Sequence, residues 1–565
     1  MISFRSFSPF LEHKLVRAYP AWCLAILFLL PIAFGLTWAI LPAFGYFPPL
    51  GFTSFSLDPW HDLFARPGLS KAISLTLFTG VTASLLSCSL AIFITATFYT
   101  SGIYKALQNT LAPILAIPHL SIAAGIAFLL APSGFIFRII ASIVGWDTPP
   151  NLIIMPDSYG LVLILTLCLK EIPFFLFIIN GALTQLNVAN SMVVARSMGY
   201  HPYTAWFRVI FPQVYARIKL PIAIVLIFSL SVVDIAVFVA PNAPPPFVIM
   251  LLDLFNDPNL ERRLVAAAGG LLLIAIIFAV IASWWLVEKI ISSLWNYYII
   301  SGGGRGYGMH ITKAFSYLIL FSVSVMAFAS LLMMIIWSFS LTWRFPSILP
   351  TKLGVDNWAD CGLCSSLTNS FFIATLVTLF SLFIVISLLE FNKHKKIQTF
   401  WFYIPLLVPQ IIFLFGFDLL LIHLEMKNFW GVAWAHWLYV MPYILLILYL
   451  PYIRFDSRYE QISYALGNSK LKTLLRVKLP MLFRPIIYAF AVGFAVSISE
   501  YLPTLIPGGG RISSLTTEMV ALASSGDRRI ISVTSVFQAL LPCVVFIIAL
   551  ALPNIQARNR KGLAV

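Results

Sequence analysis

The chain has 565 residues, of which 60% are hydrophobic, 15% aromatic and only 10% charged. Soluble globular proteins are about 45–50% apolar and about 25% charged, so this composition excludes an ordinary soluble enzyme and a disordered chain. Six cysteines are too few for a disulfide-rich secreted domain. The net charge of +15 is spread between apolar runs and forms no continuous basic surface. We therefore expect a membrane protein without a nucleic-acid partner.

Twelve apolar runs predict an all-α polytopic membrane protein. They lie at about 21–44, 72–98, 110–130, 159–181, 219–240, 265–287, 314–339, 368–390, 401–423, 430–452, 485–505 and 530–553. Runs of about 20 residues cross a bilayer as helices, whereas barrel strands would be about ten residues of alternating pattern. The first run follows Arg5, Lys14 and Arg17 and could pass for a signal peptide. It is long for one and Pro31 and Pro42 interrupt it, so we expect a retained span.

The distribution of charge predicts the orientation. With both termini placed in the cytoplasm, the inner segments hold 24 of the 36 basic residues and five acidic ones. That inner balance of +19 exceeds the +15 of the whole chain, so the outer loops are close to neutral or slightly acidic. Membrane proteins keep Lys and Arg in their cytoplasmic loops, and the pattern therefore favours cytoplasmic termini.

A glycine-rich segment near the middle of the chain predicts two tandem halves of six helices. Residues 301–308 read Ser-Gly-Gly-Gly-Arg-Gly-Tyr-Gly, a composition typical of a flexible joint. We expect a first half over 1–300, a linker over 301–312 and a second half over 313–565. The segment lacks the Lys-Ser/Thr of a phosphate-binding loop, so nucleotide hydrolysis by this chain is not predicted.

Two basic loops, one in each half, share a pattern. Each contains a glycine, Gly199 or Gly467, followed thirteen residues later by a proline, Pro212 or Pro480. Glycine permits the left-handed backbone that ends one helix, and proline disfavours α conformation just before it. The pattern predicts a helix, a glycine break, a short amphipathic helix and a proline stop. Such a helix would lie on anionic headgroups or fill a groove in a partner, and two copies in equal register favour the partner.

These loops resemble the signature loop of permease subunits of bacterial ABC importers, which reads Glu-Ala-Ala, three residues, Gly, nine residues, Ile-x-Leu-Pro. Val193 and Gln461 stand where that family has Glu, with Glu460 beside the second, so a salt bridge from that position is not carried over. The whole chain resembles two fused half-permeases, as in the iron(III) and thiamine importers and the orphan Ynj system. Residues 118–125 match 409–416, and this alignment places 23 additional residues in the outer loop near 131–158.

The resemblance implies a permease that forms the solute path and is coupled to separate ATPase subunits through loops 193–212 and 461–480. The implied coupling residues are Ala195, Gly199, Trp206, Val209, Phe211 and Pro212, with Glu460, Gly467, Leu471, Val477, Leu479 and Pro480 in the second half. The implied partners are two ABC ATPase subunits forming a homodimer, a periplasmic or extracellular solute-binding protein and the lipid bilayer of the bacterial inner membrane. ATP and Mg²⁺ would be bound by the ATPase, so no cofactor is expected on this chain and it is not expected to be an enzyme.

Ionisable residues inside the runs are candidates for the translocation path, since such groups usually face a bundle interior or an aqueous path. They are Lys170, Glu171, Asp234, Asp418, His436 and Glu500. The acids would favour a cationic solute if they line the path. They would instead cap helix ends or bond neighbouring helices if their role is structural, and a membrane histidine such as His436 is typical of an interhelical hydrogen bond. A thiamine-like cation, a metal ion and another small solute all remain open.

Two other classes were weighed against the permease. A major-facilitator-type secondary transporter also has twelve spans, but its loop after the second span is typically rich in Gly, Asp and Arg, and residues 100–107 here contain neither Asp nor Arg. A membrane enzyme would need converging His or carboxylate groups near one interface. Cys361 and Cys364 form a Cys-x-x-Cys in an outer loop, where a disulfide is possible in an oxidising periplasm. With no second cysteine pair, a metal site is not predicted.

Overall fold

The computed structural model describes residues 26–99, 101–102, 104, 115–152, 154–300, 309–359, 361–391, 399–523 and 526–558. The first half comprises the span Ile26–Phe44, η1 (Leu41–Phe44), η2 (Pro48–Leu50), α2 (Asp58–Phe64), α3 (Leu69–Phe98), α5 (His119–Leu130), α6 (Phe135–Val144), α7 (Leu161–Leu183), α8 (Val188–Ser197), α9 (Pro202–Ala205), η3 (Trp206–Ile210), α10 (Phe211–Ser231), α11 (Asp234–Val239), α12 (Phe247–Phe255) and α13 (Arg262–Ile300). Residues 301–308 of the predicted linker lie outside the described residues.

The elements from Met309 onward make up the second half of the chain. It comprises α14 (Met309–Ser338), β1 (Ser340–Thr342), β2 (Lys352–Leu353), η4 (Asp356–Ala359), α15 (Cys361–Phe391), η5 (Thr399–Tyr403), α16 (Ile404–Leu407), α17 (Gln410–His423), α18 (Phe429–Ile453), α19 (Arg458–Ala465), α20 (Lys470–Thr473), η6 (Leu474–Lys478), α21 (Leu479–Met481), α22 (Phe483–Ser499), α23 (Leu502–Gly508), α24 (Leu515–Ala523) and α25 (Arg528–Arg558). The short antiparallel pair β1–β2 is the whole of the described sheet.

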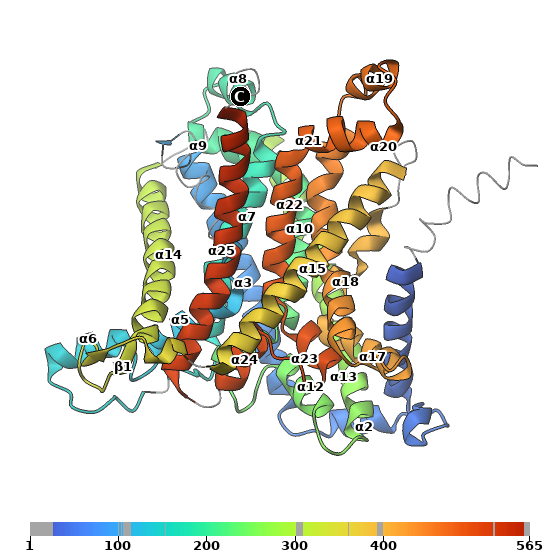
Figure 1. The fold of residues 1–565 in the computed structure, drawn as a ribbon. Coiled ribbons are helices and arrows are strands. Elements are labelled where there is room, and N and C mark those ends of the chain that lie inside the picture. Colours follow the sequence, from blue (N-terminus) through green and yellow to red (C-terminus); the bar gives the residue numbers. More distant parts are fainter. Residues whose placement is uncertain are drawn as a thin grey trace, which may run out of the picture.

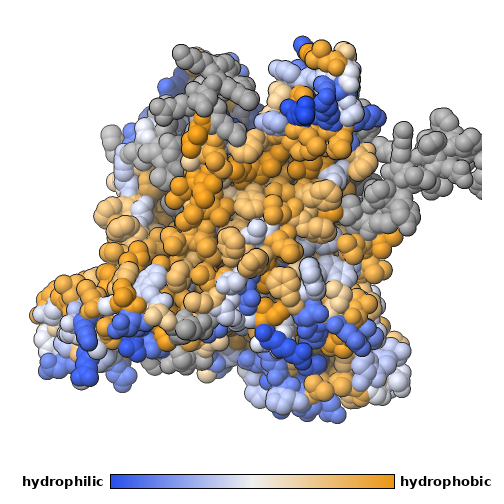
Figure 2. Space-filling model, viewed as in Figure 1, coloured by the Kyte–Doolittle hydropathy of each residue, from blue (hydrophilic) through white to orange (hydrophobic). Residues whose placement is uncertain are grey.

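The all-α polytopic membrane class is confirmed. Within the described residues, ten helices are long and apolar enough to cross a membrane, and two bent helix pairs raise the number of spans to as many as twelve. One bent pair, with an angle of 113°, is the predicted ninth run; the other, with an angle of 77°, joins Lys470–Met481 of the second loop to Phe483–Ser499, where the eleventh run lies. The additional residues near 131–158 include a helix, α6, which the sequence did not predict. Figure 2 shows an apolar band across the molecule with polar residues gathered at its two ends.

Each half contains a helix that is interrupted at a proline. In the second half Val408 is extended between α16 and α17, immediately before Pro409, and in the first half α5 begins just after Pro118. Proline has no amide hydrogen and disfavours α conformation in the preceding residue. The buried ammonium of Lys170 compensates the break in the first half, because it donates to the carbonyls of Leu115 (2.8 Å) and Ile117.

The first helix of each half packs against the other half. The span Ile26–Phe44 crosses α17 so closely that a Cβ at Gly416 would overlap the backbone of Gly35. Likewise α14 crosses α5 where a Cβ at Gly125 would overlap the backbone of Ser330. Figure 1 shows the first span and α14 at opposite sides of the bundle. Small residues at crossings let membrane helices approach closely, and here they join the two halves.

The two ends of the bundle differ. Figure 1 shows α8, α9, α19 and α20 together at one end, which we call the loop face, and the end of α25 lies there too. The opposite end, the far face, carries α2, α6, α12, α23, α24 and β1.

Candidate functional site

The two matched loops have the same backbone geometry. Gly199 and Gly467 follow α8 and α19 with φ of +83° and +77°, the left-handed region that favours glycine. In each loop the amide after the glycine donates to the carbonyl five residues earlier, at 3.2 Å in the first loop and 3.1 Å in the second. This hydrogen bond is the helix-ending motif typical of a left-handed glycine, so the predicted glycine break is present in both loops.

Replacing either glycine by valine is expected to destabilise its loop by about 1–2 kcal/mol, because a β-branched residue is strained at positive φ. A Cβ at Gly199 or Gly467 would meet no atom within 4 Å, so the strain lies in the backbone alone. Asparagine, which tolerates this conformation, should restore most of the stability. Thermal denaturation of the Val and Asn variants in detergent checks this prediction. Equal denaturation midpoints for the Val and Asn variants would contradict the left-handed backbone at these glycines.

The predicted proline stop is wrong for the first loop. Pro212 lies in the first turn of α10, and the chain continues as a span over Pro202–Ser231. One turn of π-helix precedes the proline in both loops, at Trp206–Ile210 and at Leu474–Lys478. A proline clashes with the carbonyl four residues back and offers it no amide, and the wider π turn accommodates this. Only the second loop bends, by 77°, just beyond Pro480.

Apolar side chains point outward from both loops at equivalent positions. Val194 and Met198 in α8 and its cap correspond to Ile462 and Leu466 in α19 and its cap, and all four are exposed. Met198 is 64% and Leu466 76% accessible. The resemblance did not include these four residues among the coupling residues. Exposed apolar groups at the polar end of a membrane protein indicate an interaction surface.

The predicted coupling residues occupy different depths. Three are buried, Ala195, Trp206 and Glu460; four are half-buried, Val209, Phe211, Val477 and Leu479; five are exposed, Gly199, Pro212, Gly467, Leu471 and Pro480. Trp206 is 1% exposed and contacts the rings of Phe207 and Phe211, with centroids 5.2 and 6.3 Å away. It therefore supports the π turn from beneath and does not form the outer surface.

The second loop is anchored by buried charges. The Lys478 ammonium, at 1% exposure, lies 3.1 Å from Glu460 Oε1 and 2.6 Å from Glu390 Oε2, and 3.9 Å from the centre of the Tyr452 ring. Glu460 thus makes a salt bridge that the sequence did not imply. At the equivalent positions of the first loop, Met192 replaces Glu460 and Ile210 replaces Lys478, and both are apolar. The two loops share a geometry but differ in what holds them, aromatic packing in one and an ionic cluster in the other.

Three of the predicted path residues lie together in the bundle. Asp234 and Glu500 occupy equivalent breaks, α10 to α11 and α22 to α23, and are close enough to interact electrostatically. Glu171 is buried in α7, and α11, which begins at Asp234, packs against α7. Asp234 and Glu500 are half-buried as whole residues.

The other three predicted residues have local partners. Lys170 supports the break before Pro118, as described above. Asp418 pairs with Lys427 at 3.0 Å. His436 is buried and bonds Ser497 Oγ and Thr504 Oγ1, each at 2.9 Å. His436 is thus the interhelical hydrogen bond that the alternative interpretation anticipated.

Comparison with known proteins places these features in a family context. The chain is 28% identical over 515 residues to the inner membrane ABC transporter permease protein YnjC of Escherichia coli (strain K12), covering 90% of this chain and 93% of the relative. It is 27% identical over 201 residues to the thiamine transport system permease protein ThiP of Haemophilus influenzae, covering 33% of this chain and 37% of that protein. It is 23% identical over 163 residues to the spermidine/putrescine permease PotC of the same species, covering 28% and 63%. No family model matches the chain.

Similarity over nearly the whole chain supports the role of an ABC-transporter permease. Its similarity to a full-length inner membrane permease, together with its membrane-spanning helices, places it in the bacterial inner membrane as a multi-pass protein.

Sequence reasoning missed two polar residues of the permease that meet the carboxylate cluster. His119 Nε2 lies 3.6 Å from Glu171 Oε1, and Gln410 Nε2 donates to Glu500 Oε2 at 3.0 Å. His119 follows Pro118 and Gln410 follows Pro409, so they are equivalent in the two halves. The match of residues 118–125 to residues 409–416, which lie 291 positions later, contained this signal. The residue after each proline begins the helix beyond the break. Among the described residues, no group of three or more His, Cys, Asp or Glu is arranged to hold a metal ion.

Proposed function

We propose that the permease imports a cationic solute and that its two loops each bind one subunit of a homodimeric ATPase, which would bind the ATP and Mg²⁺. The observation that carries the proposal is the repeated geometry of the loop face, where a left-handed glycine, a π turn and outward apolar residues recur 268 positions apart. Two equivalent docking surfaces suit two copies of the same partner. A solute-binding protein would deliver the solute at the far face.

The excess of basic residues in the loop-face segments supports a cytoplasmic position for that face and for both termini. ATPase subunits would then be on the side where ATP is available. The loops are held to the spans by buried residues, Trp206 in one half and Lys478 in the other. A displacement of either loop by the ATPase would therefore be transmitted to α10 or α22, and rocking of one half against the other would switch access to a central site.

A cationic solute is supported by the balance of charge at the cluster. Three carboxylates, Glu171, Asp234 and Glu500, are accompanied by one histidine, His119, and by one ammonium, Lys170, which interacts with Glu171. Carboxylates in a membrane interior are costly unless a cation or water compensates them. The relatives named for spermidine, putrescine and thiamine handle organic cations, which is consistent with this chemistry.

The docking proposal is tested by the double variant Met198→Glu and Leu466→Glu. Placing a carboxylate in each apolar surface should reduce co-purification with the cognate ATPase at least about tenfold, since burying an uncompensated charge costs more than about 1.4 kcal/mol. Leu349→Glu is the matched control, because Leu349 is equally exposed but lies in the loop between β1 and β2 at the far face. Undiminished ATPase binding by the double variant would refute the docking surface.

A further inference from the structure

The helix α6 makes an arm at the far face, and the described residues of the second half contain no equivalent helix. Ile136, Ile139 and Ile143 project from one side of it and are exposed, while Phe137 and Arg138 are buried on the other side. Figure 2 shows this end of the molecule as apolar on the side toward the central band and polar on the outer side. A helix with an outward apolar side at this depth fits the interface plane of a bilayer.

A cavity of about 560 Å³ lies between this arm and the bundle. It is lined by Ser133 and Arg138 of the arm, by Trp337, Trp343 and Phe345 of the segment from α14 to beyond β1, and by residues 526–529 at the start of α25. Tryptophans are enriched where membrane helices meet the headgroup region. The cavity therefore opens at the level of lipid headgroups.

Two arginines in the cavity carry charge that no described ion pair compensates. Arg138 donates to the carbonyls of Ser133 (3.0 Å), Arg344 and Ser347 (2.8 Å each), which satisfies its hydrogen bonds but not its charge. Arg528 donates to Ser133 Oγ at 2.8 Å and lies 5.5 Å from the centre of the Trp337 ring. No carboxylate forms an ion pair with either arginine within the described ranges.

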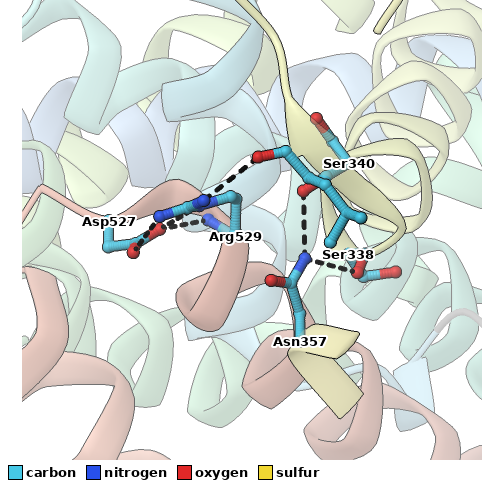
Figure 3. Close-up of polar contacts among 6 residues, drawn as sticks. Ser338, Ser340, Asn357, Asp527 and Arg529 are labelled. Atoms are coloured by element: carbon cyan, nitrogen blue, oxygen red, sulfur yellow. Dashed lines mark hydrogen bonds and ion pairs between the residues drawn. The ribbon is translucent and has the colours of Figure 1, made fainter. Parts of the chain in front are cut away.

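The third arginine of the cavity is already neutralised. Arg529 holds Asp527 through two contacts, Nε to Oδ1 at 3.1 Å and Nη2 to Oδ2 at 2.9 Å, and donates to the Leu341 carbonyl at 3.1 Å. Figure 3 shows this pair beside Asn357, which donates to the carbonyls of Ser338 and Ser340. The hydrogen bond from Arg529 to Leu341 fixes the start of α25 against β1. Three guanidiniums and one carboxylate leave the cavity a formal excess of two positive charges.

We propose that this cavity binds a phosphate group, carried by an anionic phospholipid whose acyl chains lie against α6. Arg528 would bind the phosphate, because its guanidinium keeps donors not used by Ser133. Arg138 would add charge from beneath and Trp337 and Trp343 would flank the headgroup. Basic pockets between membrane helices are known to recognise lipid headgroups. The site lies away from the carboxylate cluster and does not depend on the solute.

The test is lipid binding by the full-length permease after delipidation in an uncharged maltoside detergent. Phosphatidylglycerol or inorganic phosphate is added separately, and bound lipid is counted by native mass spectrometry while bound phosphate is measured by equilibrium dialysis. Arg528→Gln should weaken phosphatidylglycerol binding at least about tenfold, the factor that corresponds to one charge-assisted hydrogen bond. Arg528→Lys should retain part of the binding. Arg511→Gln, which removes an exposed arginine between α23 and α24, should leave it unchanged.

Each outcome is decisive. Equal lipid retention by the wild type and a folded Arg528→Gln variant would overturn the site. Binding of inorganic phosphate without binding of phosphatidylglycerol would overturn the lipid source, and equal loss in Arg511→Gln would show only general charge attraction. Arg138→Gln is not used, because Arg138 holds three carbonyls and its loss would disturb the arm itself.

Discussion

A Lys478→Ile variant is expected to lose about 3–5 kcal/mol of stability in the second loop, since removing one partner of a buried ion pair is strongly destabilising. The substitution removes the cation that Glu460 and Glu390 share. Hydrogen exchange of the α19 amides and the free energy of unfolding in denaturant measure the loss. We expect faster exchange in α19 and a weakened response of the ATPase to solute, because the loop would no longer move with α22.

The first loop supplies the matched control for this prediction. A Glu460→Met and Lys478→Ile double variant copies Met192 and Ile210, the apolar residues at the equivalent positions. Buried ion pairs can often be replaced by apolar residues of similar volume at little cost. The double variant should therefore regain most of the stability lost by Lys478→Ile alone. If both variants are equally unstable, the ion pair is not what anchors the loop.

Neutralising the carboxylates of the central cluster is expected to weaken uptake of a cationic solute. Asp234→Asn and Glu500→Gln should each raise the apparent KM at least about tenfold, which corresponds to roughly 1.4 kcal/mol, because opposite charges attract strongly in a medium of low polarity. Uptake is measured in proteoliposomes that contain the permease, its ATPase and its binding protein, with polyamines and thiamine as the first solutes tried.

Asp418→Asn is the control for this experiment. Asp418 is also an acid within an apolar run, but it pairs with Lys427 and lies outside the cluster. Its neutralisation should leave the KM for the cation unchanged. A KM that is unaffected by Asp234→Asn and Glu500→Gln, or equally raised by Asp418→Asn, would reject a cation path through the cluster.

Much of the fold follows from patterns that are local in sequence. Apolar runs of the length of a bilayer identify spans, and the recurrence of Gly199 and Pro212 at Gly467 and Pro480 identifies equivalent loops. Both signals depend on the spacing of residue types along the chain. The left-handed glycines were predictable for the same reason, because glycine is the residue that adopts this conformation without strain.

The features that could not be predicted depend on contacts between distant segments. Glu460 and Lys478 were recognised as loop residues, but their third partner, Glu390, comes from another span. The amphipathic pattern of the first loop is compatible with Trp206 facing either inward or outward. Its packing against Phe211 shows that it faces inward. Asp418 and Glu500 are both acids in apolar runs, and the sequence does not reveal that one has a lysine partner. The helix α6 is shorter than a span and resembled a loop.

The packing of each half's first helix against the other half has a consequence for biosynthesis. The span Ile26–Phe44 leaves the ribosome long before α17 of the second half, yet it is packed against α17 through Gly35 and Gly416. Its final partner does not exist until much of the second half has been translated and inserted. The first helix must therefore wait in the bilayer as an independent segment, and α14 completes the first half only after translation has passed the joint. The two halves consequently mature together, and neither can finish folding before the other has been made.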